Sequence, residues 1–140
     1  MRILICGSRD FAFPEVIQAW MEWNTPWIAT VIHGDAKGAD SMADYFARDQ
    51  VLTVEKYPAD WTKYRLTAGP IRNQQMLDEG KPDRVAAFFT DLNTSKGTRD
   101  MVTRSLKAGL PVTAIEARVI SEDELREKLG LPKKTIAPDN

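Results

Sequence analysis

The chain alternates short apolar runs with longer segments in which apolar residues recur every three or four positions. The short runs are typical of buried strands, and the longer spacing is typical of helices with one buried face. The predicted strands are residues 2–6, 27–32, 51–57, 84–89 and 111–115. The predicted helices are residues 14–23, 38–48, 70–77, 97–108 and 121–129.

This order of elements predicts an α/β fold. Strands that alternate with helices are joined by right-handed crossovers, so we expect a Rossmann-like, doubly wound and mainly parallel sheet of about five strands, with helices on both faces. Residues 1–118 are expected to form this domain and residues 119–131 a C-terminal helix packed on it, with Ser121 as N-cap and Glu124 as its capping-box partner. Residues 132–140 are expected to be a flexible tail.

Length and composition favour one domain with a small ligand. The chain has 140 residues and a formal net charge of −1, without the basic excess typical of nucleic-acid-binding proteins, so nucleic acid is disfavoured as a partner. The single cysteine, Cys6, excludes an internal disulfide framework and predicts a reducing, cytoplasmic location. No apolar stretch approaches bilayer length, so no membrane segment is expected. One histidine, His33, does not make a metal site with its neighbours, and no cofactor is expected.

The first predicted strand ends in a short polar loop. Gly7 permits close backbone approach, Ser8 can donate a hydrogen bond to a phosphate oxygen, and Arg9 offers the planar fork of donors that suits a phosphate. An ordinary turn between a strand and a helix explains the same residues, because the full G-x-G-x-x-G fingerprint is absent.

The second loop is richer in groups that suit an anion. Gly34 and Gly38 bracket Asp35 and Lys37, and Gly38 leads into a helix whose free N–H groups can receive a phosphate. Lys37 adds a positive charge. Asp40, in the first helical turn, either compensates the helix dipole or binds a ribose.

Further candidates lie later in the chain. The irregular segment 58–70 is too long for an ordinary connection, and its Trp61 is either a stacking platform for a base or an anchor of the loop. Arg72 and Asn73 stand near the start of the next helix, as ligand contacts or as solvated surface. Gly97 and Thr98 begin the helix after the fourth strand, where Thr98 either caps the helix or holds a phosphate.

Five short motifs occur in order over residues 1–115. They are Gly7-Ser8-Arg9-Asp10, Gly34-Asp35-Ala36-Lys37-Gly38-Ala39-Asp40, Pro58-Ala59-Asp60-Trp61, Gly69-Pro70-Ile71-Arg72-Asn73 and Gly97-Thr98. With these motifs the chain resembles the SLOG superfamily, in particular its small YspA-like branch, which shares motifs with the DprA and LOG families. The resemblance implies a Rossmann-like fold that binds nucleotides or nucleotide-derived signals, with the glycine loops and the Arg-Asn pair facing the ligand.

One departure from the LOG pattern bears on catalysis. LOG-type phosphoribohydrolases carry Pro-Gly-Gly-x-Gly-Thr-x-x-Glu, whose glutamate serves cleavage of the N-glycosidic bond, and this chain has Met101 at that position. Asp100 lies one residue away, which on a helix is a rotation of about 100°. Asp100, Asp40 and Asp35 are the remaining candidates for acid-base work, and Asp60 is a fourth.

Three functions therefore stay open at the level of sequence. The first is binding of a nucleotide-like small molecule by a sensor or sequestering protein, the second is hydrolysis of a nucleoside 5′-monophosphate at its N-glycosidic bond, and the third is DprA-like binding of single-stranded DNA. A homodimer or higher homo-oligomer is a further expectation, with Trp20, Trp23 and Trp27 as its apolar interface. Core packing is the alternative role of these tryptophans.

Overall fold

A computed structural model describes residues 1–116 and 119–134 of the chain. The described strands are β1 (Arg2–Gly7), β2 (Thr30–His33), β3 (Thr53–Lys56), β4 (Arg84–Phe88), β5 (Val112–Ile115) and β6 (Val119–Ile120). The described α-helices are α1 (Pro14–Asn24), α2 (Ala39–Asp49), α3 (Trp61–Tyr64), α4 (Ala68–Asp78), α5 (Lys96–Lys107) and α6 (Glu122–Leu129). Two short 3₁₀ turns, η1 (Thr25–Trp27) and η2 (Arg65–Thr67), complete the elements.

The strands form one sheet in the order β3-β2-β1-β4-β5-β6. The first five are parallel, and β6 pairs with β5 in the antiparallel sense. This arrangement confirms the predicted Rossmann-like, mainly parallel fold. The strand order reverses between β1 and β4, and in open α/β sheets ligands bind outside the carboxyl ends of the strands at such a point.

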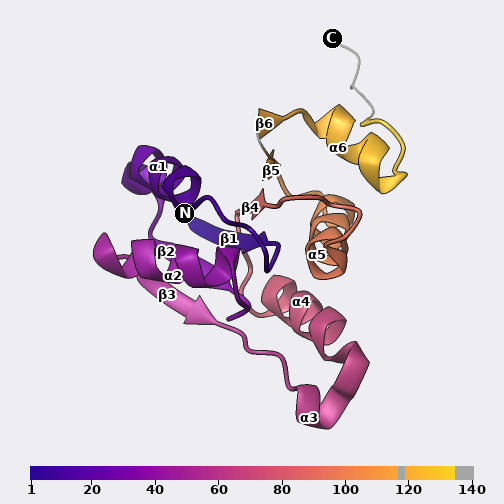
Figure 1. Ribbon diagram of the computed structural model, residues 1–140, viewed down its shortest axis with the longest axis horizontal. Helices are drawn as coiled ribbons and strands as arrows, with labels where there is room; N and C mark the ends of the chain where they lie inside the picture. The colour runs from indigo at the N-terminus through magenta and orange to yellow at the C-terminus, as the bar shows by residue number, and fades with distance from the viewer. Residues whose placement is uncertain (117–118, 135–140) are drawn as a thin grey trace.

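Helices cover both faces of the sheet (Figure 1). Because successive side chains of a strand point to opposite faces, β1 sends Ile3 and Ile5 to the core beneath α1 and α2, and Leu4 and Cys6 to the core beneath α4, α5 and α6. These β1 residues are buried, as expected for a central parallel strand. The structure therefore places Cys6 inside the core.

The segment between β3 and α4 is more ordered than the sequence predicted. It contains α3, where the side chain of the N-cap residue Asp60 accepts a hydrogen bond from the backbone N–H of Lys63, and then η2. In Figure 1 α3 lies at the lower edge, outside the two helix layers. Helix α4 begins at Ala68 instead of Pro70. Pro70 is tolerated as the third residue of α4 because the N–H groups of a first helical turn have no partner within the helix.

The C-terminal part of the described chain contains one element that the sequence did not predict and one that it did. Strand β6 has only two residues, too few for a visible pattern. Helix α6 begins as expected, with the Ser121 side chain accepting a hydrogen bond from the backbone N–H of Glu124, and its Leu125 and Leu129 join the buried core. The predicted tail from residue 135 onward lies outside the described residues. None of the described helices is long and apolar enough to cross a membrane.

Candidate functional site

Ser8 ties the first glycine loop to the segment after β4. Its backbone N–H donates to the carbonyl of Phe88 at 2.9 Å, and its Oγ accepts from the backbone N–H of Thr90 at 3.1 Å. A Cβ on Gly7 would overlap the Phe88 carbonyl and the Ala39 side chain, so only glycine fits between β4 and α2 at this point. The first and third loops therefore lie side by side at the switch point of the sheet.

Gly38 brings the second loop onto the first. Its φ of +77° favours glycine, and a Cβ there would overlap the carbonyl of Ser8 and lie 2.6 Å from that of Arg9. The next residue, Ala39, donates its N–H to the Ser8 carbonyl at 3.4 Å. The start of α2 is thus fixed against the backbone that follows β1.

Asp40 closes the second loop from inside. Its Oδ2 accepts from the N–H groups of Gly34 at 3.0 Å and Ala36 at 3.3 Å, and the residue is only 5% exposed. Burial raises the pKa of this carboxyl, while those two hydrogen bonds and the nearby positive charge of Arg72 oppose the rise. This loop-closing role was not among those that the sequence indicated for Asp40.

The other charged residues of the second loop lie outward. Lys37 is exposed. Asp35 has a left-handed backbone with φ +56°, and its Oδ1 lies 3.9 Å from Nζ of Lys56.

His33 is fully buried at the end of β2, where its Nδ1 accepts a hydrogen bond from the Asp35 N–H at 2.9 Å. An accepting Nδ1 assigns the proton to Nε2, which donates to Oδ2 of Asp44 at 2.7 Å.

Arg72 reaches from α4 to the carboxyl ends of β2 and β3. Its Nη1 donates to the carbonyl of Gly34 and, at 3.3 Å, to that of Tyr57, and its Nε donates to Oδ1 of Asn73 at 3.0 Å. Burial lowers the pKa of Arg72; the positive charge of Arg9 lowers it further, and Asp40 opposes both. Nη1 of this guanidinium is therefore engaged with backbone carbonyls, and Nε with the side chain of Asn73.

Asn73 extends the chain of contacts to α5. This residue is 3% exposed, and its Nδ2 donates to Oδ2 of Asp100 at 3.0 Å and to the carbonyl of Gly97 at 3.3 Å. The same Asp100 oxygen accepts from Nε of Arg104 at 2.8 Å. Met101, at the position of the LOG glutamate, is a core residue. Asp100 is accordingly the carboxylate that accepts a hydrogen bond from Asn73 of the Arg-Asn pair.

The first turn of α5 has open donors. Ser95, at the N-cap position, makes no side-chain capping hydrogen bond, and a Cβ added at Gly97 would have no neighbour within 4 Å. Thr98 lies inside the helix and is largely buried, and its hydroxyl makes no hydrogen bond to another described residue. Thr98 is therefore not a cap, which leaves the phosphate-binding role as its open prediction.

Trp61 contacts the side chain of Arg9, which belongs to the first glycine loop. The Arg9 guanidinium carbon lies 5.9 Å from the centroid of the Trp61 ring, and the same ring lies beside Gly69 at the start of α4. The indole is 48% exposed. A cation over an exposed indole leaves part of the ring surface open to a further stacking partner.

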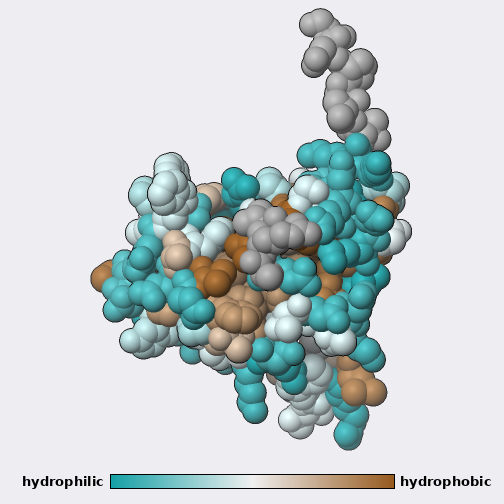
Figure 2. All heavy atoms as spheres, turned by 45° about the horizontal axis from the view of Figure 1, so that its top comes forward, coloured by the Kyte–Doolittle hydropathy of each residue, from teal (hydrophilic) through white to brown (hydrophobic). Residues whose placement is uncertain are grey.

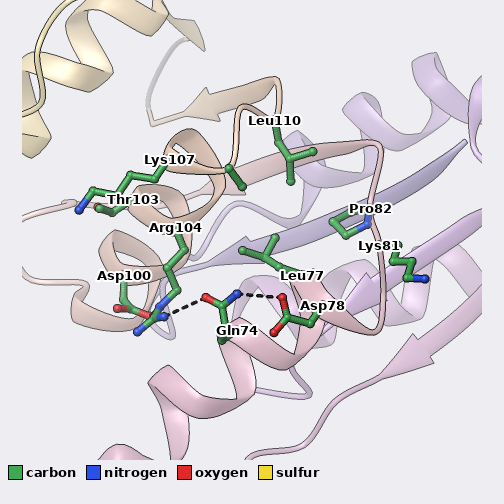
Figure 3. Close-up of a pocket in the computed structure, with 11 residues that line it drawn as sticks. Gln74, Leu77, Asp78, Lys81, Pro82, Asp100, Thr103, Arg104, Lys107 and Leu110 are labelled. Carbon is green, nitrogen blue, oxygen red and sulfur yellow. Dashed lines mark hydrogen bonds and ion pairs between the residues drawn. The ribbon is translucent and has the colours of Figure 1, made fainter.

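Two hollows lie beside these elements: the smaller at the carboxyl edge of the sheet, and the larger reaching the amino ends of β4 and β5, where Lys81, Pro82 and Leu110 line it. The larger, about 640 Å³, is an open groove between α4 and α5, where Arg104 bridges Asp100 and Gln74 (Figure 3). The smaller, about 310 Å³, has Phe13, Val16, Phe89, Thr90 and Glu116 as its described lining. Thr90, which lines the smaller hollow, is also the residue whose backbone N–H bonds to Ser8. Among the described residues there is no group of three or more His, Cys, Asp or Glu side chains that could hold a metal ion.

A Rossmann-like sheet with glycine loops gathered at its switch point defines the class of protein, and comparisons with known proteins identify the family. Residues 1–64 match the family described as "YspA, cpYpsA-related SLOG family". The "Gene 61 protein" of Mycobacterium phage D29 is 35% identical over 128 aligned residues, covering 79% of this chain and 93% of that protein. The chain belongs to the YspA, cpYpsA-related SLOG family.

Proposed function

We propose that this protein binds a nucleotide or nucleotide-derived small molecule at the carboxyl edge of its sheet, as a sensor or sequestering protein. The observation that carries the proposal is the chain of direct contacts that joins the predicted loops. Gly38 packs on the carbonyls of Ser8 and Arg9, and Asn73 bonds to Gly97. Segments that are distant in the sequence thus meet along one edge, where the first N–H groups of α5 can receive an anion.

The charges along this edge suit an anion. Arg9 is exposed, and its positive charge disfavours the charged form of the neighbouring Arg72. A phosphate between the two guanidinium groups would offset that repulsion and would add charge-assisted hydrogen bonds. The Thr98 hydroxyl and the first N–H groups of α5 provide further donors.

A thermal-shift panel tests this proposal. Nucleoside mono- and diphosphates, cyclic nucleotides and ADP-ribose derivatives are each added to the purified protein at millimolar concentration. A ligand at 100 times its Kd stabilises the native state by about 2.7 kcal/mol, which for 140 residues raises Tm by roughly 9 °C. No shift with any member of the panel would refute nucleotide binding.

Two arginine variants locate the phosphate. Arg9→Gln removes an exposed cation at the carboxyl edge, and Arg84→Gln removes an exposed cation at the opposite edge, where β4 begins. Arg9→Gln should weaken nucleotide binding about tenfold, because a charged hydrogen bond to phosphate is lost. Arg84→Gln is the matched control. Equal effects of the two variants would count against a site at the carboxyl edge.

A second candidate is N-glycosidic hydrolysis of a nucleoside 5′-monophosphate, which the position of Asp100 favours. Its Oδ2 is held by Asn73 and Arg104, so the carboxylate is oriented beside Gly97. Such a reaction needs a carboxylate near the anomeric carbon. Chromatography of nucleotides incubated with the protein would detect the free base, and Asp100→Asn should abolish its release while the exposed control Asp78→Asn should not. Absence of any release would refute the hydrolase.

Self-association and binding of single-stranded DNA stay predictions. Trp20 packs edge-on against Phe88, whereas Trp23 and Trp27 are 79% and 59% exposed at the end of α1 and in η1. An apolar interface would therefore be built from the latter two. Sedimentation equilibrium of the native chain and of Trp23→Ser tests this interface, and a mobility-shift assay at low salt tests single-stranded DNA, whose binding would weaken steeply with salt.

A further inference from the structure

The smaller hollow lies at the same switch point as the proposed phosphate site. Phe13 and Val16 line it from the segment after β1, Phe89 and Thr90 from the segment after β4, and Glu116 from the segment after β5. Thr90 donates its N–H to Ser8 Oγ at 3.1 Å, so this hollow and the first glycine loop share a residue pair. The hollow therefore adjoins the first glycine loop.

The chemistry of the lining differs from that of the loops. Two phenylalanines and a valine make it mainly apolar, and Glu116 adds one carboxylate. Figure 2 shows hydrophobic side chains gathered near the middle of a largely hydrophilic face. The smaller hollow has a volume of about 310 Å³, at the small end of ligand pockets, which run from about 300 to 1,000 Å³. It accommodates one part of a nucleotide, and an apolar wall suits a flat ring.

Phe13 is held in place as an aromatic wall. Its ring meets that of Phe11 edge-on, with centroids 5.7 Å apart and an interplanar angle of 73°, and Phe11 in turn packs against Phe88 in the core. Phe13 is nevertheless 50% exposed. The exposed part of the ring is open for a base to stack on it.

We propose that this hollow is the base-binding subsite of the ligand and that it selects a guanine-type ring. The ring stacks on Phe13, and the carboxylate of Glu116 accepts hydrogen bonds from the adjacent N1–H and N2 amino groups of guanine. Adenine offers one amino donor beside an acceptor nitrogen, which repels a carboxylate. The inference rests on the proposed nucleotide binding and adds to it the position and the identity of the base.

Calorimetric titration of the intact protein with five probes separates the two halves of the ligand. The probes are ribose 5-phosphate, guanosine, and the 5′-monophosphates of guanosine, inosine and adenosine. Affinity should fall in the order guanosine, inosine and adenosine monophosphate. Guanine faces Glu116 with two donor groups and hypoxanthine with one, whereas the single donor of adenine stands beside an acceptor nitrogen that repels the carboxylate. Ribose 5-phosphate reports on the phosphate edge alone.

Three variants test the two residues. Phe13→Ala and the better-packed Phe13→Leu should each weaken guanosine monophosphate at least fivefold, as expected for loss of base stacking, and leave ribose 5-phosphate within twofold. Glu116→Gln should remove most of the preference for guanosine over adenosine monophosphate. Glu15→Gln, which removes an exposed carboxylate on α1, is the charge-matched control and should keep that preference.

Each outcome decides between the two proposals. Nucleotide binding that is unaffected by the Phe13 variants, or a base preference that survives Glu116→Gln, would overturn the base subsite and leave nucleotide binding standing. Guanosine bound through Phe13 with no gain from its phosphate would overturn the phosphate edge and leave the subsite standing. If none of the five probes binds, the guanine subsite is wrong, and the thermal-shift panel then decides whether the protein binds any nucleotide.

Discussion

Replacing Gly38 by alanine tests the contact between the first two loops. The backbone at Gly38 has φ +77° and ψ −123°, which only glycine adopts readily, and the added Cβ would lie 2.6 Å from the Arg9 carbonyl oxygen. Backbone strain of about 1–3 kcal/mol and overpacking of about 1–3 kcal/mol give an expected loss of about 2–6 kcal/mol. For a chain of 140 residues this lowers Tm by roughly 7–20 °C.

Gly97→Ala is the matched control, since it makes the same chemical change in another of the loops. Its Cβ would meet nothing within 4 Å, and alanine is favoured over glycine inside a helix by about 0.5–1 kcal/mol. We expect Tm to rise by roughly 2–3 °C in this variant. Calorimetric unfolding of both variants measures the difference. A Gly38→Ala protein as stable as the native chain would refute the close approach of the loops.

Three further predictions concern single side chains. Ser8→Ala removes the acceptor of the Thr90 N–H, so unfolding free energy should fall by about 1–2 kcal/mol and hydrogen exchange at that amide should accelerate; unchanged exchange would contradict the contact. Burial raises the pKa of the Cys6 thiol, so a thiol reagent at pH 8 should modify it only when urea unfolds the chain, and rapid labelling of native protein would contradict its burial. The hydrogen bond from Arg48, followed by that from His33, holds the pKa of Asp44 below its usual value. Its stabilising contribution is therefore present above about pH 4 and is lost as the pH falls, so Asp44→Asn should flatten the acid limb of the unfolding curve.

Much of the fold follows from local patterns in the sequence. Buried parallel strands appear as continuous apolar runs, so 2–6 and 84–89 were recognisable without tertiary information. Loops at the carboxyl ends of parallel strands must share one edge, and that rule alone predicted the neighbourhood of Gly7, Gly38 and Gly97. Strand β6 escaped prediction because two residues carry no periodicity.

The uses of the side chains at this edge did not follow from the sequence. Asp40 closes its own loop through two backbone N–H groups, and Arg72 binds the carbonyls of Gly34 and Tyr57. The contacts of Asp40 are local and depend on the conformation of its loop, whereas those of Arg72 depend on distances across the fold, which sequence spacing does not contain. The hollow behind Phe13 was missed for the same reason, because its lining comes from three separate connections.

Amide shifts in ¹H–¹⁵N spectra during titration with guanosine 5′-monophosphate test the location of the ligand most directly. If the carboxyl edge binds the nucleotide, the largest shifts fall on Gly38, Thr90 and Thr98, and the amides of Asp83 and Arg84 at the opposite edge stay unchanged. Shifts confined to the groove between α4 and α5, or to the opposite edge of the sheet, would contradict a site built from the glycine loops.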